Sequence, residues 1–406
     1  MLTVMKFGGS SVADLAHIRN VAQRCIEKQQ AGSQVVVVLS AMGKTTDGLI
    51  ATAKQITEKP SRREMDMLLA TGEQVSVSLM AITMIQMGIS AVSLNAWQVP
   101  MHTTSDYQNA RFKRIDTERI RKELDDNKIV IVTGFQGINR YDDITTLGRG
   151  GSDTSAVALA AVLHADLCQI YTDVDGVFTA DPRCVKGARK LDEITYDEML
   201  ELATLGAQVL HNRSVEMAKR YNVNLEVLSS FSGQPGTKVK EVAKTMEKPY
   251  VSGVAKDKNI ARLALVGLPD KPGTAFRIFS TLARHKINVD IILQSIGRND
   301  TKDISFTVTH SDLDKAREAM EKMKDALGFD HIDVTDDIAK VSIVGAGMIN
   351  NPGVASLMFE ALFNAGINIH MISTSEIKVS VLVDKSDADN AVQVIHDRFF
   401  EEYGNL

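Results

Sequence analysis

Two glycine-rich turns carry side chains that could bind and transfer a phosphoryl group. The first, residues 6–11 (KFGGSS), places Lys6 two residues before a pair of glycines, where an apolar stretch gives way to a helical pattern. The glycines let backbone N–H groups approach phosphate oxygens, and a lysine reaches a transferred phosphoryl group as a point charge. The lysine precedes the glycines, so this is not a P-loop. Taken alone, the segment also fits a structural tight turn.

The second turn, residues 145–154 (TTLGRGGSDT), opens another helical pattern. Arg149 could clamp a carboxylate with both arms of its guanidinium group, and the turn amides could hold an anion. A simpler alternative is that Ser152 or Asp153 caps the helix. Capping alone, however, does not require an arginine between glycines.

An acidic loop, residues 172–183 (TDVDGVFTADPR), follows a strand pattern. Ligands of parallel sheets bind beyond the carboxyl ends of the strands, where this loop offers three aspartates and an arginine. The spacing is not that of an EF-hand, because the closing glutamate is absent. A solvated loop is the alternative interpretation.

Three further polar residues are candidates for substrate binding. Glu73 lies inside an apolar helical pattern, and Ser40 and Thr46 follow a buried strand pattern. The nine histidines form no HExxH motif and no close cluster, so no metal site is expected. Glycine-rich and acidic turns with one lysine and one arginine suit phosphoryl transfer from a nucleotide, which depends on positioning and charge stabilisation.

The composition is that of an ordinary soluble protein and excludes several classes. The 406 residues include 46 Lys plus Arg and 51 Asp plus Glu, a net charge of −5, which gives no footprint for nucleic acid or a lipid surface. Three cysteines are too few for a disulfide scaffold and fit a reducing, cytoplasmic compartment. Lys6 interrupts the N-terminal apolar stretch, and no apolar run approaches the roughly 18–20 residues of a membrane span.

The elements that must position these residues alternate between strands and helices. β-branched runs predict buried strands, and longer apolar periodicities predict helices. The alternation indicates an α/β fold with a mostly parallel sheet covered on both faces. The predicted strands are 3–5, 35–39, 129–132, 166–172 and 225–228, and the predicted helices are 14–31, 62–87, 116–126, 153–164 and 206–221.

The C-terminal part of the chain contains an internal repeat. Residues 272–273 (PG) recur at 352–353, and 287–289 (INV) recur as INI at 367–369, both offset by 80. The pattern predicts two copies of a small βαββαβ unit. The second copy lacks a final strand, and an open sheet edge invites unwanted pairing. We therefore expect residues 251–254 to complete the second copy, with the first copy nested inside it.

The repeat also sets the expected domain boundaries. The first domain is expected at 1–245, the first repeat at 260–337, and the second repeat at 251–257 plus 338–406. Within the first repeat, the predicted elements are strand 260–267, helix 272–285, strands 287–294 and 303–309, helix 312–326 and a short strand at 332–334; the last helix of the chain is predicted at 386–400.

Taken together, KFGGSS at 6–11, TGE at 71–73, TTLGRGGSD at 145–153 and TDVDGVFTADPR at 172–183 resemble the amino acid kinase superfamily. With a repeat at 251–406 similar to paired ACT regulatory domains, nearly the whole chain resembles the aspartate kinase family. The acidic motif is shared with glutamate 5-kinase and bacterial uridylate kinase, whereas KFGGSS with GRGGSD and the tandem repeat is more specific. The length argues against a form with a fused homoserine dehydrogenase.

The resemblance implies an amino acid kinase fold, two ferredoxin-like ACT units, and ATP-dependent phosphorylation of L-aspartate to 4-phospho-L-aspartate, the first step towards lysine, threonine and methionine. Lys6 would neutralise the transferred group, and Asp173 would orient the phosphate-binding groups. Magnesium would arrive with ATP, so no metal site of the protein is expected. The residues implied in nucleotide binding are Lys6, Phe7, Gly8, Gly9, Ser40, Ser152, Thr172, Asp173, Phe178, Thr179, Ala180, Asp181, Pro182, Arg183 and Gln208. Those implied in aspartate binding are Thr46, Glu73, Arg149, Gly150, Gly151 and Ser152.

Within that set, Glu73 would hold the ammonium group of aspartate and Arg149 a carboxylate. One residue departs from the family pattern: relatives commonly carry a lysine at the position of Gln208. A glutamine cannot supply a cation, so Arg183 or Arg213 would have to compensate.

The same resemblance implies feedback inhibition by lysine, threonine or both at the ACT units. The helix that begins near Pro272 offers amides for an effector carboxylate, and Asp270 and Asp290 offer acceptors for its ammonium group. The second copy has Asn350 and His370 instead, so the effector is expected in the first copy. The candidate effector residues are Asp270, Gly273, Ala275, Ile287, Asn288, Val289, Asp290, Gln294, Ile367, Asn368 and Thr374.

Two other functions stay open at the level of sequence. A kinase of the same fold could use glutamate, and a catalytically inactive amino-acid sensor would share the repeat, although Lys6, Arg149 and Asp173 argue against inactivity. ACT units usually pair through sheet edges, so a homo-oligomer is expected. An internal start at Met246 would produce a separate regulatory chain. Neither a nucleic-acid partner nor a membrane is expected.

Overall fold

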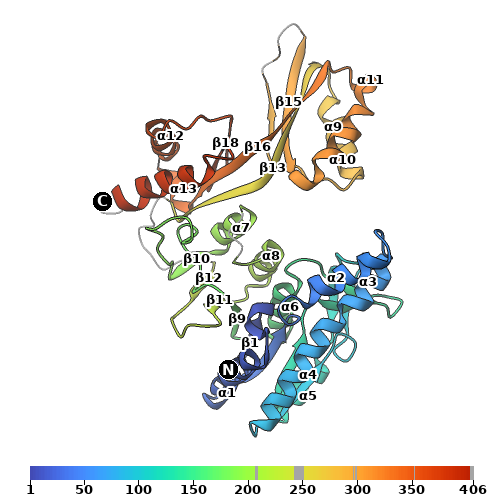
Figure 1. Ribbon diagram of the computed structural model, residues 1–406. Helices are drawn as coiled ribbons and strands as arrows, with labels where there is room; N and C mark the ends of the chain where they lie inside the picture. Colours follow the sequence, from blue (N-terminus) through green and yellow to red (C-terminus); the bar gives the residue numbers. More distant parts are fainter. Residues whose placement is uncertain (206–208, 242–250, 296, 298–299, 352, 403–406) are drawn as a thin grey trace. The chain divides into compact units, whose positions relative to one another are not determined.

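The computed structural model describes residues 1–205, 209–241, 251–295, 297, 300–351 and 353–402 (Figure 1). The chain divides into two compact units. The first contains Met1–Phe178 and Arg189–Met246, and the second contains Thr179–Ala188 and Glu247–Leu406. Each unit is described by itself below.

The first unit alternates helices and strands, as the sequence predicts. Its strands are β1 (Leu2–Phe7), β2 (Gln34–Leu39), β3 (Ala91–Leu94), β4 (Met101–Thr103), β5 (Phe112–Ile115), β6 (Ile129–Thr133), β7 (Gln136–Ile138), β8 (Ile144–Thr146), β9 (Leu167–Thr172), β10 (Glu193–Thr195), β11 (Leu225–Ser229) and β12 (Thr237–Lys240). Its helices are η1 (Gly9–Val12), α1 (Leu15–Gln30), α2 (Thr45–Ile56), α3 (Arg62–Leu69), α4 (Thr71–Gln86), α5 (Glu118–Asp125), α6 (Gly151–Leu163), α7 (Tyr196–Thr204) and α8 (Asn212–Tyr221).

An eight-stranded sheet forms the centre of this unit, in the order β10-β12-β11-β9-β1-β2-β6-β3. Every pair is parallel except β11 with β12, which confirms the predicted mostly parallel α/β fold. The register aligns Phe7 with Leu39 and with Tyr171, so these strands end at one edge of the sheet. The turns that follow them are thereby brought together.

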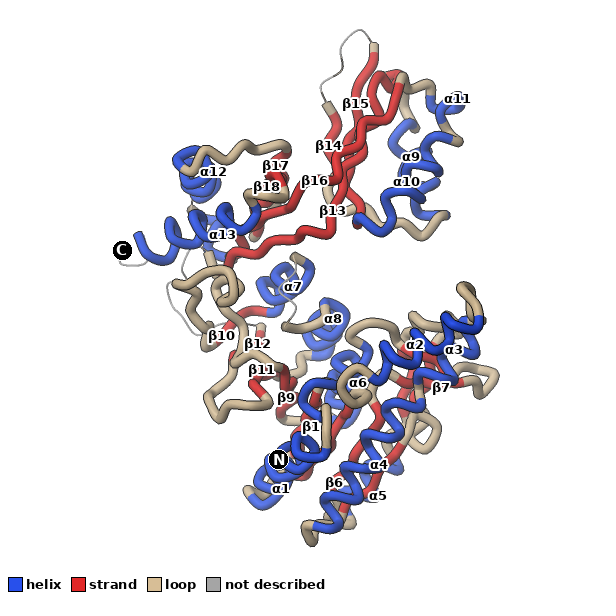
Figure 2. Tube along the Cα trace, in the orientation of Figure 1, coloured by secondary structure: helices blue, strands red, loops and turns tan. Residues whose placement is uncertain are grey.

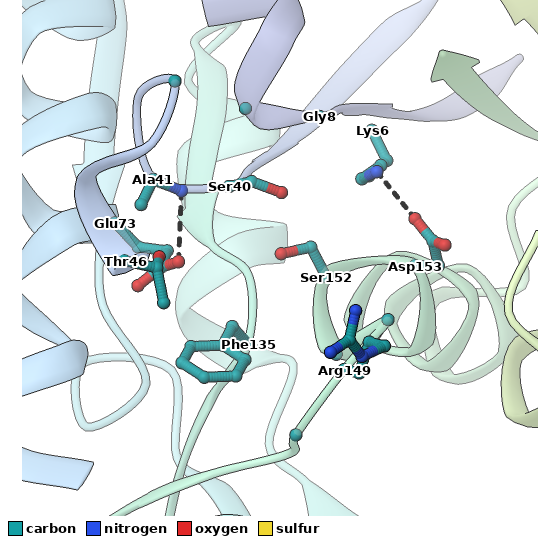
Figure 3. Close-up of a pocket in the computed structure, with 15 residues that line it drawn as sticks. Lys6, Gly8, Ser40, Ala41, Thr46, Glu73, Phe135, Arg149, Ser152 and Asp153 are labelled. Atoms are coloured by element: carbon teal, nitrogen blue, oxygen red, sulfur yellow. Dashed lines mark hydrogen bonds and ion pairs between the residues drawn. The ribbon is translucent and has the colours of Figure 1, made fainter. Parts of the chain in front are cut away.

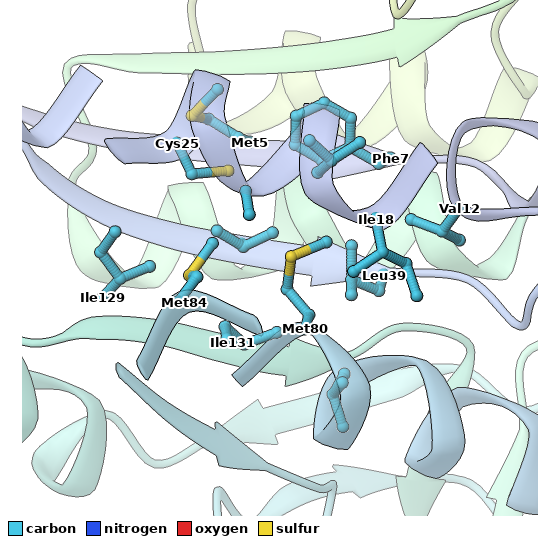
Figure 4. Close-up of a cluster of buried hydrophobic side chains, with 14 of the residues drawn as sticks. Met5, Phe7, Val12, Ile18, Cys25, Leu39, Met80, Met84, Ile129 and Ile131 are labelled. Atoms are coloured by element: carbon cyan, nitrogen blue, oxygen red, sulfur yellow. The ribbon is translucent and has the colours of Figure 1, made fainter. Parts of the chain in front are cut away.

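The valine-rich strands are buried on both faces, as expected for a parallel sheet covered by helices. On one face, Met5 and Leu39 pack against Ile18 of α1 and Met80 of α4 (Figure 4). The alternate residues of the strands point to the opposite face because side chains alternate along a strand. Helix α6, which is buried over most of its surface, contacts β1, β2 and β9.

The predicted helix 62–87 is in fact two helices, α3 and α4, which meet at Ala70. We expected no apolar run long enough for a membrane span. Contrary to this expectation, residues 62–86 are long and apolar enough to cross a membrane, judged by length and composition alone. Half of that window is buried inside the structure, and core helices of soluble proteins pass the same test. The stretch is therefore weak evidence for a membrane span.

A smaller sheet, in the order β5-β4-β7-β8, leads the chain into the second glycine-rich turn. The buried Asp66 of α3 holds the last residue of β8, accepting hydrogen bonds from the Thr146 N–H at 2.8 Å and from its hydroxyl at 2.8 Å. The Asp66 carboxylate also accepts from the Gln108 N–H. Since the turn 147–150 begins directly after Thr146, Asp66 fixes where the turn starts.

The second unit contains one six-stranded sheet in the order β14-β15-β13-β16-β18-β17, with every pair antiparallel. Figure 2 shows how long β13 and β16 are relative to the other strands of this sheet. The strands are β13 (Gly253–Pro269), β14 (Ile292–Gln294), β15 (Thr301–Thr309), β16 (His331–Val344), β17 (Met371–Thr374) and β18 (Lys378–Asp384). The helices are α9 (Thr274–Arg284), η2 (His310–Asp312), α10 (Leu313–Glu321), α11 (Lys324–Leu327), η3 (Ala346–Asn350), α12 (Val354–Asn364), α13 (Ala388–Asp397) and a π-helical turn η4 (Arg398–Glu402).

The two repeats share the two long strands. The first part of β13 pairs with the last part of β16, Gly253 opposite Val344 and Asp257 opposite Lys340, and the rest of β13 pairs with the first part of β16 and with β15. The predicted pairing of the upstream segment with the second repeat is thus confirmed. The predicted strand 260–267 and the end of the predicted strand 251–254 fall in one continuous strand, β13, and the short strand predicted at 332–334 is part of the longer β16. We propose that the nested domain boundaries given above describe this arrangement.

Each repeat has its own core. Ile278 of α9 and Phe306 of β15 belong to the first, and Met358 of α12 and Ile395 of α13 belong to the second. Ala180 and Val185 also belong to the second core, although they fall within the predicted first domain. The chain therefore leaves the first unit after Phe178 and returns to it at Arg189.

Candidate active site

A cavity of about 310 Å³ lies at the carboxyl ends of β1 and β2, beside the first turns of α4 and α6 (Figure 3). It brings together predicted residues from four separate stretches of sequence. The lining residues are Lys6, Gly8, Gly9, Ser40, Ala41, Gly43, Thr46, Glu73, Phe135, Gly148, Arg149, Gly150, Gly151, Ser152 and Asp153.

Lys6 forms an ion pair with Asp153 inside this cavity. Its Nζ lies 2.7 Å from Oδ1 of Asp153, and both side chains are 12% exposed. Asp153 lies in the first turn of α6, where the helix dipole favours a carboxylate. The pair directs the ammonium group of Lys6 into the cavity (Figure 3). The sequence analysis considered Asp153 only as a possible helix cap. Its position directly after the glycine-rich turn could have identified it as a residue of the site.

The turn after β1 requires glycine at position 9. A Cβ atom there would lie 2.8 Å from the Ala41 carbonyl oxygen, closer than real Cβ contacts. The Gly43 N–H donates to the Gly9 carbonyl oxygen at 2.9 Å, so the turns after β1 and β2 are tied together. This close approach places Lys6 and Ser40 on the same cavity.

The second glycine-rich turn enters α6 in a left-handed conformation. Gly150 is the N-cap residue, with φ of 68°, and a Cβ atom there would lie 2.2 Å from the ring of His211. The alternative that Ser152 or Asp153 caps the helix is therefore wrong, because the helix already begins at Gly151. Both side chains are left to face the cavity instead.

Glu73 is an unusual acid for a substrate cavity because it is only 3% exposed. Its Oε1 accepts a hydrogen bond from the Ala41 N–H at 3.1 Å, whereas its buried Oε2 has no hydrogen-bond partner among the described residues. Burial raises the pKa of Glu73 to about 8. A buried carboxyl group with one unsatisfied oxygen suits a cationic ligand such as an ammonium group.

Arg149 is exposed at the opposite side of the cavity from Glu73 (Figure 3). Within the described part of the chain, no ion pair engages its guanidinium group. The cavity thus combines a buried acid, a paired lysine and an available guanidinium fork. This arrangement suits a ligand with both an ammonium and a carboxylate group, held next to a cation that can stabilise phosphate charge.

The acidic loop does not line this cavity. Thr172 and Asp173 contact each other, with Oγ1 of Thr172 donating to Oδ1 of Asp173 at 3.1 Å. Asp181 forms an ion pair with Arg183 at 2.8 Å, which lowers the pKa of Asp181. Arg183 is therefore already engaged. The nucleotide-binding roles predicted for the loop residues Thr172, Asp173, Phe178, Thr179, Ala180, Asp181, Pro182 and Arg183 stay predictions.

Three other predicted nucleotide contacts have different outcomes. Gln208 lies outside the described residues. The side chain of Phe7 is fully buried and stacks on Tyr171 with a centroid distance of 4.4 Å, so only its backbone could serve a ligand. Arg213 donates to the carbonyl oxygens of Leu147 and Ala110, at 2.7 and 3.0 Å. It braces the second glycine-rich turn and is not an uncommitted cation.

The predicted effector residues lie in the second unit, and both predicted carboxylates are already paired. Asp270 lies 2.5 Å from Lys302, and Asp290 pairs with the buried Lys340. Gly273 is the N-cap of α9, with φ of 91°. Ile287 and Ile367 are core residues, whereas Ala275, Asn288, Gln294, Asn368 and Thr374 are exposed and Val289 is half-buried.

Residues able to hold a metal ion do not cluster in the described ranges: no group of three or more His, Cys, Asp or Glu side chains is positioned for one. The cavity presents the carboxylates of Glu73 and Asp153, together with lysine and arginine cations, glycine amides and hydroxyl groups. The ammonium group, the amides and the hydroxyl groups suit phosphate oxygens.

Comparisons with known families cover most of the chain. Residues 1–229 match the amino acid kinase family, and residues 262–327 and 341–399 each match an ACT domain. An aspartokinase of Bacillus sp. (strain MGA3) is 52% identical over 398 residues, covering 98% of this chain and 97% of that protein.

Two solved structures of E. coli aspartokinase III are also similar. The complex with aspartate and ADP (R-state) has a TM-score of 0.85 at 28% identity, and covers 98% of this chain and 100% of the other. The complex with lysine and aspartate (T-state) has a TM-score of 0.76 at 28% identity, and covers 98% and 99%.

Proposed function

The chain belongs to the aspartokinase family of enzymes, which join an amino acid kinase domain to ACT domains, and we propose that it phosphorylates L-aspartate with ATP. The products are 4-phospho-L-aspartate and ADP. The observation that carries the proposal is the single cavity shared by Glu73, Arg149 and the Lys6–Asp153 pair. The similar E. coli enzyme binds aspartate and ADP.

In this reaction, the buried Oε2 of Glu73 receives the ammonium group of aspartate. Arg149 clamps a carboxylate group with both arms, and Thr46, Gly150, Gly151 and Ser152 complete the aspartate site. A side-chain carboxylate is ionised at neutral pH, so no general base is needed. One of its oxygens attacks the γ-phosphorus; the new P–O bond forms as the bond to the β,γ-bridging oxygen breaks, and ADP leaves.

Lys6 stabilises the negative charge of the transferred group, and Asp153 holds the Lys6 ammonium in place. Backbone amides at Gly8 and Gly9, with Ser40, hold phosphate oxygens. Magnesium carried by the nucleotide neutralises phosphate charge. We propose that Phe7, Ser152, Thr172, Asp173 and the loop 178–183 complete the nucleotide site, with Asp173 orienting the phosphate-binding groups.

Regulation forms the second part of the proposal. Lysine, threonine or both bind the ACT units and inhibit the enzyme, which catalyses the first step towards lysine, threonine and methionine in the cytoplasm. The T-state of the similar E. coli enzyme holds lysine, which supports an amino acid effector. The chain forms a homo-oligomer through its ACT units, and a shorter chain starting at Met246 joins the assembly.

Measurement of ADP release with aspartate, glutamate and UMP as acceptors tests the catalytic proposal. We expect turnover with aspartate and at least tenfold lower kcat/KM with glutamate, since one methylene group changes binding by roughly 1–3 kcal/mol. Equal or better turnover with glutamate would identify the alternative kinase, and no turnover with any acceptor would favour an amino-acid sensor. Titration with lysine, threonine and their mixture then identifies the effector.

A further inference from the structure

The segment Thr179–Ala188, here called the crossover segment, belongs to the second unit although residues on both sides of it belong to the first. We propose that the second ACT repeat positions the nucleotide loop through this segment, and that His396 is the positioning residue that holds it. The inference rests on the proposed function, because it assumes that the loop 172–183 serves the nucleotide.

The two ends of the crossover segment are held together in the first unit. Phe178 and Lys190 form an antiparallel bridge, and the Leu191 N–H donates to the Val177 carbonyl oxygen at 2.8 Å. The Val177 N–H in turn donates to the Thr237 hydroxyl at 2.9 Å. The segment therefore leaves the first unit and returns to it at nearly the same place, as a closed loop.

The body of the crossover segment is built into the second repeat. The Val254 N–H donates to the Thr179 carbonyl oxygen at 2.7 Å. This hydrogen bond holds the Thr179 backbone beside the first residues of β13. Ala180 and Val185 are 4% and 1% exposed and pack in the core of the second repeat. A Cβ atom on Gly187 would lie 2.7 Å from Oε1 of Glu401, so this side of the segment is also closely packed.

His396 makes a side-chain hydrogen bond that joins α13 to this segment. Its Nε2 lies 2.9 Å from Oγ1 of Thr179, and the imidazole is completely buried and stacks on Phe400 at 4.6 Å. Helix α13 packs on β13 and β16, the strands that both repeats share. A rearrangement of the ACT sheet that moves α13 would therefore move Thr179, which lies in the same loop as Asp173.

This arrangement gives the regulatory unit direct physical control of part of the nucleotide loop. Phe178 and the residues before it belong to the first unit, whereas Thr179–Arg183 belong to the second unit, where Ala180 packs in the core of the second repeat. Because well-packed cores are not continuously deformable, a discrete change in the second repeat is transmitted to the loop. The second repeat and the nucleotide loop are thus coupled through the continuous backbone at Phe178 and Thr179.

Two pairs of variants test the hydrogen bond. Thr179→Val and His396→Leu remove it at nearly constant volume, whereas Thr179→Ser and His396→Gln keep a hydroxyl group and a donor nitrogen. A matched control is Ser380→Ala, which removes the buried hydroxyl pair between Ser342 and Ser380 at 2.7 Å elsewhere in the same sheet. Amide hydrogen exchange and the affinity for MgADP, measured by calorimetry, are the readouts.

We expect amide exchange in residues 179–188 and at Val254 to accelerate by about twofold to tenfold in Thr179→Val and His396→Leu, the range for one net hydrogen bond. The MgADP dissociation constant should rise at least twofold in both, while KM for aspartate stays within about twofold. His396→Gln and Ser380→Ala should resemble the unmodified chain in both readouts, and Thr179→Ser should keep the slow amide exchange of the unmodified chain.

The proposal is overturned if exchange in the crossover segment is the same in His396→Leu and Ser380→Ala. It is also overturned if exchange accelerates but MgADP affinity stays unchanged in both disruptive variants. Neither readout depends on turnover. Failure of the unmodified chain to phosphorylate aspartate would therefore refute the proposed function separately.

Discussion

At the scale of single residues, the cavity depends on two ionisable groups in unlike environments. Lys6 is mostly buried and is paired with Asp153 at 2.7 Å. Glu73 is uncompensated, and burial raises its pKa to about 8. The first group is therefore suited to stabilise a charge that develops during reaction, and the second to receive a charge that arrives with the substrate.

Substitution of Lys6 by alanine should reduce kcat by about 10²–10³-fold, because the lost charge acts mainly on the transition state. KM for aspartate should change by less than about threefold, since the proposed role of Lys6 is to contact the transferred phosphoryl group and not aspartate. Steady-state kinetics measures both values. Asp153→Asn is the companion variant and should cost less, because the lysine remains. A near-normal kcat in Lys6→Ala would show that Lys6 is not a catalytic residue.

The raised pKa of Glu73 predicts a pH dependence of substrate binding. The ammonium group of aspartate requires ionised Glu73, so KM for aspartate should fall by up to about tenfold per pH unit as pH rises towards 8, and then level off. Glu73→Gln should raise KM and abolish this dependence. A pH profile of KM that is flat between 6 and 8 in the unmodified chain would contradict the assignment.

The same group has the opposite effect on the stability of the ligand-free protein. In the folded state Glu73 keeps its proton up to about pH 8, whereas in the unfolded state it ionises near its ordinary pKa of 4.5. The folded state thus binds more protons in this window, and the free energy of unfolding falls as pH rises from about 4.5 to 8. Thermal unfolding of Glu73→Gln should show a smaller decrease over this range.

At the scale of elements, the site depends on how a strand or turn enters a helix. The chain enters α6 through Gly150, which has a left-handed conformation and packs against His211. Arg213 of α8 donates a hydrogen bond to the Leu147 carbonyl oxygen in the preceding turn. These contacts place Arg149 at the rim of the cavity. The sequence shows the glycines, but the neighbour that requires them comes from a helix distant in the chain.

Gly150→Ala should destabilise the first unit and weaken aspartate binding, because it adds left-handed strain of roughly 1–2 kcal/mol and a clash with His211. Gly32→Ala is the matched control: its φ is 90°, but nothing lies within 4 Å of its Cβ position. We expect Gly150→Ala to lower the midpoint of thermal unfolding more than Gly32→Ala. Equal shifts would mean that the His211 contact relaxes at no cost.

At the scale of the whole molecule, two compact units share one chain that crosses between them more than once. The second unit is a single sheet in which both repeats share β13 and β16, so the repeats cannot rearrange independently. Most predicted effector residues lie in the first repeat, on the side of the edge strand β14, whereas Ile367, Asn368 and Thr374 lie in the second repeat, on the side of the opposite edge strand β17. The two predicted carboxylates of the first repeat are paired with lysines, so an effector ammonium group bound there would have to compete with Lys302 or Lys340.

Gln294→Ala should relieve inhibition by lysine or threonine and leave uninhibited turnover unchanged, because Gln294 is exposed on the edge strand and can both donate to and accept from an amino acid. Inhibition curves for the effectors, alone and mixed, measure the change. A coupling of about 1–3 kcal/mol sets the scale of the shift. Full inhibition of this variant at unchanged effector concentration would place the effector elsewhere.

The sequence by itself determined the fold class, the repeat and most of the cavity, because these follow from short-range patterns. The valine runs required a parallel sheet covered on both faces, and strands ending at one edge bring Lys6, Ser40 and Thr46 together. The missing strand of the second repeat predicted its pairing partner, since an unpaired edge is unfavourable.

Only the tertiary structure decided which side chains neutralise one another and to which unit each segment belongs. Asp153 pairs with Lys6. The two carboxylates predicted to bind an effector, Asp270 and Asp290, form ion pairs with Lys302 and Lys340. The sequence predicts that the crossover segment is part of the first domain. In the structure it belongs to the second unit, and its residues Ala180 and Val185 pack in the core of the second repeat. The physical reason is that charge pairing and core packing depend on contacts between residues far apart in the chain, which no local pattern records.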